Sequence, residues 1–249
     1  MSGNHALIIG ANQGIGLGFV RHLLQRQDYS RVYAAARTIK TPELENLPPE
    51  QAAKLTWIPM DITREPQIVV GIEQIRQDIQ TLNLVINCVG LLHSETVQPE
   101  KSLRQVTMDQ LTQYFQVNSV GTVLLAKHLL PLLNHQQRSV FVSISAKVGS
   151  IGDNQLGGWY GYRASKAALN MFIRNVAIEY GRKSPKTIVA ALHPGTTDTR
   201  LSKPFQGSVP PEKLFSVDRT VAQLLDVIDH LKIEQNGGFF SWDGTQLPW

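Results

Sequence analysis

The sequence predicts an α/β fold in which the strands of a parallel sheet alternate with helices. Short apolar runs that read as buried strands recur along the 249 residues, and segments with helical apolar spacing separate them. Strands connected through helices pair in parallel by right-handed crossovers. The sequence shows no internal repeat and no low-complexity segment. We therefore expect residues 1–249 to form one domain.

Four strands are predicted in the first half of the chain. Residues 7–9 are apolar and a glycine follows them, as expected for a buried strand. Residues 15–26 follow as a helix, because Ile15, Phe19 and Leu23 recur on one side. The remaining expected elements are strands over 32–36, 55–58 and 84–86, a Pro-rich connector over 42–50, and a helix over 66–79.

The same alternation is predicted for the second half. Residues 108–133 form one long helix or a pair of helices, and the Pro/Gly-rich stretch Lys203–Lys213 is the best candidate for a mobile loop. The other expected elements are strands over 140–144 and 188–192, helices over 162–180 and 221–231, and a final short strand over 239–240.

Charge and cysteine content exclude several classes of protein. Lys and Arg number 24 and Asp and Glu 20, a net charge of +4 with no long basic run, so we expect no nucleic-acid partner. Cys88 is the single cysteine, which excludes an intrachain disulfide and a cysteine-based zinc site. The seven histidines are scattered without metal-ligand spacing, so no metal site is expected.

No targeting or membrane segment is expected either. The most apolar long stretch, residues 120–133, contains Lys127, His128 and Pro131 and is shorter than the roughly 20 residues that a bilayer span requires. These features, together with the single cysteine, favour a cytoplasmic location.

A glycine-rich turn links the first strand to the first helix. It reads Gly10-Ala-Asn-Gln-Gly14-Ile-Gly16. Glycine lets the backbone approach a ligand closely, and the helix that follows offers free N–H groups and a positive dipole end to a pyrophosphate. Because this turn opens a strand–helix–strand unit, dinucleotide binding is favoured over a tight turn without a ligand.

The end of the second strand indicates which dinucleotide binds. In such folds an acidic residue there binds the ribose 2′-hydroxyl of NAD, and a nearby Arg accommodates the 2′-phosphate of NADP. No acid occurs between Asp28 and Glu43, and Arg37 follows the strand. A guanidinium can grip a phosphate in a bidentate manner, so NADP(H) is preferred over NAD(H). The alternative is that Arg37 is a solvated surface arginine.

A tyrosine and a lysine four residues apart provide the chemistry. Tyr162 and Lys166 lie on one face of a helix. A neighbouring ammonium favours the tyrosinate and lowers a pKa that is ordinarily near 10. Tyr162 can then exchange a proton with a carbonyl or hydroxyl oxygen while hydride moves at the adjacent carbon. Tyr160 has no such partner, because residue 164 is alanine.

With these motifs the chain resembles the short-chain dehydrogenase/reductase family. The matched residues occur in the family's order: the turn 10–16, Asn87 to Gly90, Asn118, Tyr162 with Lys166, and Pro194-Gly195. Within the family, residues 157–160 and 243–249 resemble the C-factor-like and sniffer-like carbonyl reductases. The resemblance implies a Rossmann-type, doubly wound parallel sheet of about seven strands flanked by helices.

The resemblance also implies roles for matched positions. Tyr162 is the catalytic acid/base, Lys166 holds the nicotinamide ribose, and Asn118 orders a water in the proton relay. The implied cofactor-binding set is Gly10, Asn12, Gln13, Gly14, Ile15, Gly16, Arg37, Asp61, Ile62, Asn87, Cys88, Val89, Gly90, Tyr162, Lys166, Pro194, Gly195, Thr197 and Thr199. NADP-dependent members often carry Arg where this chain has Gln13, so one phosphate contact is missing.

One catalytic position departs from the family pattern. Members often carry Ser-Ser-x-x-Gly after the fifth strand, and the second Ser polarises the substrate carbonyl. Counting back from Gly149 puts Ala146 at that position. We predict that Ser145 takes the role through a small backbone adjustment, with Ser143 as the alternative. If neither reaches the cleft, the missing donor costs about 10²–10³ in rate.

The sequence thus predicts an NADPH-dependent oxidoreductase that interconverts a carbonyl, in an aldehyde or ketone, and an alcohol. The expected partner is that small-molecule substrate, and the resemblance adds a homodimer or homotetramer. The alternative is a cofactor-binding signalling or regulatory protein of the C-factor type with little turnover.

Overall fold

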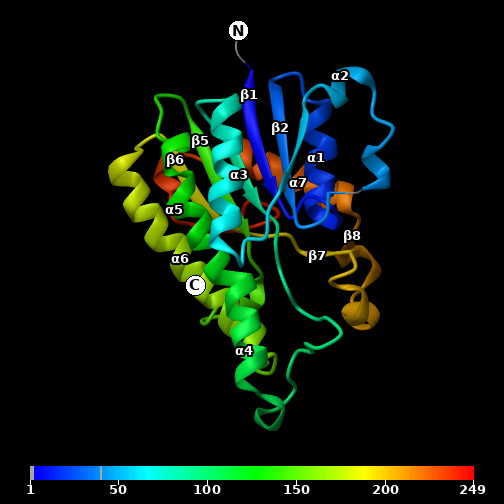
Figure 1. The fold of residues 1–249 in the computed structure, drawn as a ribbon. Helices are drawn as coiled ribbons and strands as arrows, with labels where there is room; N and C mark the ends of the chain where they lie inside the picture. Colours follow the sequence, from blue (N-terminus) through cyan, green and yellow to red (C-terminus); the bar gives the residue numbers. More distant parts are fainter. Residues whose placement is uncertain (1–2, 40) are drawn as a thin grey trace.

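The computed structural model describes residues 3–39 and 41–249, and a seven-stranded sheet runs through their centre (Figure 1). All its ladders are parallel, in the order β3-β2-β1-β4-β5-β6-β9. The strands are β1 (Asn4–Ile9), β2 (Tyr29–Ala36), β3 (Leu55–Pro59), β4 (Leu84–Asn87), β5 (Ser139–Ile144), β6 (Thr187–His193) and β9 (Phe239–Ser241). The predicted doubly wound sheet is confirmed.

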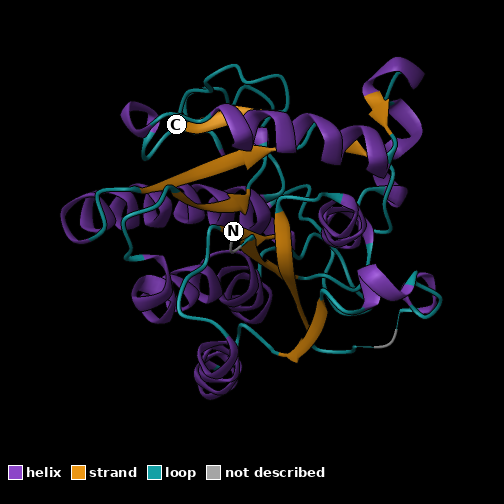
Figure 2. Cartoon of the chain, turned by 90° about the horizontal axis from the view of Figure 1, so that it is seen from above, coloured by secondary structure: helices purple, strands orange, loops and turns teal. Residues whose placement is uncertain are grey.

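Helices cover both faces of this sheet (Figure 2). One apolar core contains Ala6 and Ile8 of β1 and packs under α1 and α7, whereas Leu7 and Ile9 point to the other core, under α3, α5 and α6. Strands buried on both faces read as continuous apolar runs, which is why the sequence revealed them. The helices are α1 (Gly14–Gln25), α2 (Pro49–Ala52), α3 (Glu65–Asp78), α4 (Met108–Phe115), α5 (Gly121–Leu133), α6 (Tyr160–Lys183) and α7 (Val217–His230).

The order of the strands places the ligand-binding crevice. The chain winds from β1 outward to β3 and then returns to β4 on the other side of β1. In open α/β sheets ligands bind outside the carboxyl ends of the strands at this reversal. The glycine turn and the residues after β4 both lie there.

Residues 108–133, predicted as one long helix or a pair of helices, form a pair joined without a break. Between α4 and α5 the chain makes a π-helical turn over Gln116–Val120. Such turns are rare and often lie at functional sites. Asn118 lies in this one.

Two segments expected to be irregular contain short helical pieces. The connector 42–50 holds a 3₁₀ turn at Pro42–Leu44 and the start of α2. Lys203–Lys213 contains 3₁₀ turns at Lys203–Ser208 and Pro211–Lys213, and the flanking strands β7 (Thr196–Thr197) and β8 (Leu214–Phe215) pair in parallel. Prolines stand in the first turn of each piece, where a missing N–H costs nothing.

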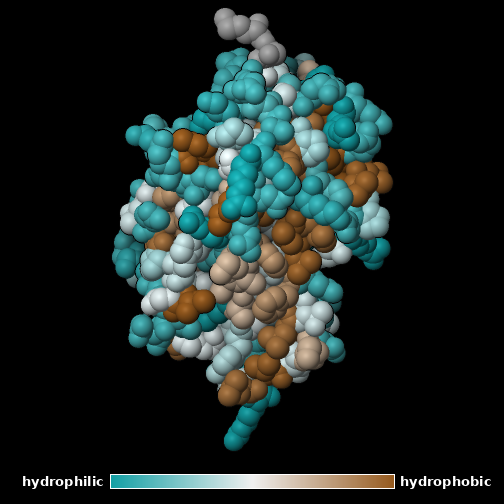
Figure 3. All heavy atoms as spheres, turned by 90° about the vertical axis from the view of Figure 1, so that its left-hand side faces the viewer, coloured by the Kyte–Doolittle hydropathy of each residue, from teal (hydrophilic) through white to brown (hydrophobic). Residues whose placement is uncertain are grey.

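The surface on the side of α4, α5 and α6 carries a band of apolar atoms among polar ones (Figure 3). Exposed apolar side chains on these elements and on the turn between α4 and α5 are Met108, Val120, Met171 and Ile178. In the part of the chain described, no helix combines the length and the hydropathy needed to cross a membrane.

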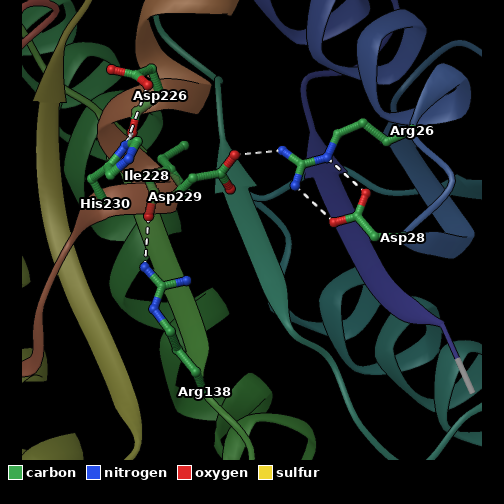
Figure 4. Close-up of polar contacts among 7 residues, drawn as sticks. All are labelled: Arg26, Asp28, Arg138, Asp226, Ile228, Asp229 and His230. Carbon is green, nitrogen blue, oxygen red and sulfur yellow. Dashed lines mark hydrogen bonds and ion pairs between the residues drawn. The ribbon is translucent and has the colours of Figure 1, made fainter. Parts of the chain in front are cut away.

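Two arginines contact the last turn of α7, Arg26 from the end of α1 and Arg138 from the residue before β5 (Figure 4). Arg138 donates from Nη2 to the carbonyl oxygens of Ile228, at 2.7 Å, and Leu231, at 3.0 Å. Arg26 clamps Asp28 with two hydrogen bonds and reaches Asp229 of α7 at 2.6 Å. Arg138 therefore adds a charged donor to carbonyls at the end of α7, where helical pairing is weak or missing.

Replacing Arg138 should lower stability and leave catalysis alone. Arg138→Met removes both charge-assisted hydrogen bonds, and we expect the free energy of unfolding to fall by about 1–3 kcal/mol. Thermal melting should show it as a loss of about 2–4 °C per kcal/mol. Arg104→Met, at an exposed arginine with no side-chain hydrogen bond among residues 3–39 and 41–249, is the control. Equal melting of the two variants would contradict this role.

Candidate active site

A cavity of about 740 Å³ opens at the carboxyl ends of the strands. Its walls come from the turns and strand ends after β1 to β6 and from α6. Most of the predicted site residues lie on these walls: Gly10, Asn12, Gln13, Gly14, Ile15, Gly16, Arg37, Asp61, Ile62, Cys88, Val89, Gly90, Ser145, Tyr162, Lys166, Pro194, Gly195, Thr197 and Thr199. Asn87 and Asn118 are buried behind the wall, at 0% and 1% exposure.

The glycine turn forms a backbone cradle at one end of the cavity. Gly10 and Gly14 have φ of 78° and 53°, a region that L side chains rarely adopt. A Cβ on Gly16 would lie 2.1 Å from the carbonyl oxygen of Gly10, so the turn closes only with glycine there. No side chain caps the N-terminus of α1. The free N–H groups of its first turn therefore face a site suited to a pyrophosphate.

The wall next to this cradle would hold the adenosine end of a dinucleotide. Ala36, Arg37 and Thr38 after β2 and Asp61 to Thr63 after β3 line it. Partial burial alone would raise the pKa of Asp61, but hydrogen bonds from Thr63 and the charges of Arg37 and Arg64 hold that pKa below its usual value. The shape and the donor set of this end of the cavity fit a nicotinamide dinucleotide.

Tyr162 and Lys166 stand on the first turns of α6, at 7% and 3% exposure. Lys166 Nζ lies 6.0 Å from the centre of the Tyr162 ring and donates to the carbonyl oxygen of Ile144 at 2.9 Å. The expected lowering of the Tyr162 pKa by the neighbouring ammonium is wrong for the protein without a ligand, because burial raises that pKa above its usual value. Burial also lowers the pKa of Lys166 to about 8. Tyr162 thus keeps its proton at neutral pH in the protein without a ligand, which is the state that can donate to an oxygen.

Three residues in the left-handed backbone region precede α6 and set the direction in which this helix begins. Gly157, Gly158 and Trp159 have φ of 63°, 65° and 49° in succession. Buried Glu100 holds this turn from the side, because its carbonyl oxygen accepts from Trp159 N and its carboxylate accepts from Gly161 N at 3.1 Å. A carboxylate on free helix N–H groups is stabilising. The turn sets the Trp159 ring edge-on to Tyr162, with centroids 6.1 Å apart.

Asn118 joins three parts of the site. Its Oδ1 accepts from Leu91 N at 2.6 Å, and its Nδ2 donates to Leu91 O at 2.8 Å and to Ser165 Oγ at 3.0 Å. Asn87 plays a similar part behind β4, since it donates to Thr122 Oγ1 at 2.8 Å and accepts from Val89 N at 3.1 Å. Both amides fix the loop after β4 from behind.

The two candidate serines on β5 and its end have different surroundings. Ser143 is fully buried, and its Oγ lies 3.4 Å from Asn87 Nδ2. Ser145 lies on the cavity wall, but its hydroxyl donates to Asn170 Oδ1 of α6 at 2.6 Å. The side chain that lines the cavity at the next position is the methyl group of Ala146.

Another part of the cavity wall is apolar and aromatic. Trp159 packs edge-on against Phe205, with centroids 5.0 Å apart, and both belong to a cluster around Tyr162 and Tyr114. Leu92, Ala146 and Val148 complete this wall. Such a pocket suits an uncharged substrate with apolar or ring-shaped substituents.

The sequence analysis does not predict several residues of the cavity wall. Trp159 and Phe205 were not predicted, and their signal was weak because they come from a connecting turn and a Pro/Gly-rich loop. His193 also lies on the wall. Its signal was stronger, since it directly precedes the Pro194-Gly195 motif at the end of a predicted strand.

Comparisons with known proteins identify the family of this chain. A family model described as short chain dehydrogenase matches residues 4–208. Benzil reductase ((S)-benzoin forming) of Saccharomyces cerevisiae is 33% identical over 84% of this chain and 78% of its own, and C-signal of Myxococcus xanthus is 31% identical over 59% and 84%.

Solved structures agree over the whole chain. The NADPH-bound carbonyl reductase from chicken fatty liver superposes with a TM-score of 0.87 at 29% identity, covering 100% of both chains. The carbonyl reductase Sniffer of D. melanogaster gives 0.87 at 28%, covering 99% of this chain and all of its own. This chain belongs to the short-chain dehydrogenase family and is an NAD(P)-dependent oxidoreductase.

Proposed function

We propose that this protein is an NADPH-dependent reductase of apolar, ring-bearing aldehydes and ketones, with Tyr162 as the proton donor. One observation carries the proposal: a buried, protonated Tyr162 lies one helical turn from Lys166, and a glycine cradle and an aromatic cluster line the same cavity. Reduction needs these three features together, and a protein that only binds a dinucleotide needs the cradle alone.

Tyr162, Lys166 and Asn118 have separate roles in the reduction. When bound, the cofactor supplies a hydride to the carbonyl carbon of the substrate. The electron pair of the C=O π bond moves to oxygen, which takes the proton of Tyr162 Oη. Lys166 favours the resulting tyrosinate by its charge and holds the cofactor ribose. Asn118 keeps the loop after β4 and the start of α6 in register and orders a water in the proton relay.

We further propose that NADP(H) is preferred over NAD(H). Support comes from Arg37 on the wall after β2 and from the absence of any carboxylate between Asp28 and Glu43 in the sequence. Arg37 is exposed at the rim, where its guanidinium can close on a 2′-phosphate.

Arg37→Ala should therefore separate the two cofactors. We expect the Kd of NADPH to rise about tenfold or more, because a hydrogen bond to a charged group contributes about 1.5–3 kcal/mol and about 1.4 kcal/mol is tenfold. The Kd of NADH should stay within about twofold of wild type. Cofactor fluorescence titration measures both. An NADPH affinity unchanged by this substitution, or tighter binding of NADH in wild type, would contradict the role of Arg37.

The substrate class rests on the aromatic pocket of Trp159 and Phe205. The benzil reductase relative, named for an aryl diketone, supports the same class. We also propose that residues 1–249 act as one domain, that the protein is cytoplasmic, and that it forms a homodimer or homotetramer. The exposed apolar band on the side of α4 to α6 supports self-association.

The test is NADPH oxidation over a panel of aldehydes, ketones and aryl diketones. Turnover that is fastest with the aryl compounds supports the proposal. A second candidate function is regulatory cofactor binding with little turnover, which the similarity to C-signal and the alanine at position 146 favour. NADPH binding without turnover on any carbonyl would select that function.

A further inference from the structure

Apart from the Tyr162 hydroxyl, the end of β5 offers the cavity no free hydroxyl donor at positions 143, 145 or 146. Ala146 contributes a methyl group there, Ser143 is buried behind the wall, and the Ser145 proton is directed to Asn170. A developing oxyanion is stabilised by preorganised donors, and the loss of one typically costs about 10²–10³ in kcat. A reductase built on this site therefore needs a donor from another element.

His193 is a neighbouring side chain with a free donor. It ends β6, lines the same cavity as Tyr162, and is partly exposed there. Its Nδ1 accepts the backbone N–H of Lys147, next to Ala146, at 3.2 Å. An accepting Nδ1 in a neutral ring leaves the proton on Nε2. Nε2 has no hydrogen-bond partner among residues 3–39 and 41–249.

The ring is neutral at physiological pH. Burial lowers the pKa of His193 to about 4, the charge of Lys147 acts in the same direction, and the carboxylate of Asp243 opposes them. A neutral imidazole can polarise a carbonyl by donating a hydrogen bond while keeping its proton, as in triosephosphate isomerase.

We infer that His193 Nε2–H is the hydrogen-bond donor that polarises the substrate carbonyl, in the role that a serine at position 146 would have. Nε2 and the Tyr162 hydroxyl then address the same oxygen. His193 stabilises the charge that develops as hydride reaches the carbon, and Tyr162 supplies the proton. The inference rests on the proposed reductase function.

Two substitutions separate the donor from its structural hydrogen bond. In His193→Asn the amide oxygen stands near the place of Nδ1 and keeps the bond to Lys147 N, but no donor reaches the place of Nε2. In His193→Gln the amide nitrogen reaches the place of Nε2. We expect kcat for an aryl diketone to fall about 10²-fold or more in His193→Asn and less than about tenfold in His193→Gln. NADPH affinity and melting temperature should match wild type in both.

A rescuing substitution and an NMR spectrum of the histidines provide two further tests. Adding Ala146→Ser to His193→Asn should restore kcat at least tenfold, because the hydroxyl replaces the lost donor. Nitrogen-15 NMR of the histidines should show His193 as the neutral Nε2–H tautomer from pH 5.5 to 8.

An active wild type with His193→Asn at wild-type kcat overturns the inference and leaves the proposed function intact. The same holds if Ser145→Ala abolishes turnover that His193→Asn keeps, which would return the role to Ser145. An inactive wild type refutes both the proposed function and the role of His193. A charged or Nδ1–H imidazole at pH 7 also overturns the inference.

Discussion

Tyr162→Phe is expected to lower kcat for carbonyl reduction by about 10²–10⁴, because the reaction loses its general acid. The phenyl ring keeps the edge-on packing against Trp159 and Tyr114, whose centroids lie 6.1 and 6.2 Å from that of Tyr162. Binding of NADPH should therefore stay within a few-fold of wild type. Steady-state NADPH oxidation and fluorescence titration of the same preparations measure the two quantities.

Tyr160→Phe is the matched control. Tyr160 is the first residue of the same helix, is 37% exposed, and is not one of the described residues that line the cavity. We expect its kcat to equal that of wild type. Wild-type turnover in Tyr162→Phe would remove Tyr162 from the mechanism, and loss in both variants would mean that the start of α6 is disturbed.

Lys166→Met is expected to lower activity and raise stability together. The ammonium is 3% exposed, and burial lowers its pKa from 10.5 to about 8. This shift corresponds to a cost of about 3 kcal/mol for keeping the charged form inside the folded protein. Met has a similar length and no charge, so at pH 7 the unfolding free energy should rise by up to that amount, or about 2–4 °C per kcal/mol. We expect kcat/KM to fall about 10²-fold or more, because the site loses a positioning contact.

The stability difference should depend on pH with a definite sign. Below pH 8 Lys166 is charged in both the folded and the unfolded wild type, and the cost of burial is fully present. Between pH 8 and 10.5 the folded protein has released the proton while the unfolded chain still binds it. The unfolding free energy of wild type should therefore rise relative to that of Lys166→Met between pH 8 and 10.5. Melting curves without cofactor at pH 7, 8.5 and 10 will measure this difference. A gap that widens with pH would contradict the assignment.

The elements themselves could be predicted because their signals are local. Leu7 to Ile9 and Val32 to Ala36 are apolar on both faces, which identifies strands covered on two sides, and Ile68, Ile72 and Ile75 mark the buried side of α3. The glycine turn and the pair Tyr162 and Lys166 are equally local. The glycine turn depends on backbone sterics within seven residues, and the pair depends on the geometry of one helical turn.

The details of the active site were not predictable in this way. The bond between His193 and Lys147 joins residues 46 apart, and the Glu100 cap on Gly161 joins residues 61 apart. Each depends on how two elements meet, to within a fraction of an ångström. A pattern within one element carries no such information. The π-helical turn at Asn118 could not be predicted either, because the apolar spacing of an ordinary helix continues through residues 116–120.

The sequence by itself therefore determined the parallel α/β sheet, the glycine turn after β1, and the placement of Tyr162 and Lys166 one helical turn apart. Periodicity, glycine positions and spacing on one helix are enough for these. Only the tertiary structure decided that Ser145 gives its proton to Asn170, that Lys166 has a pKa of about 8, and that His193 stands beside Ala146. Hydrogen-bond partners and burial are set by neighbours distant in sequence, and they fix what each polar group can still do.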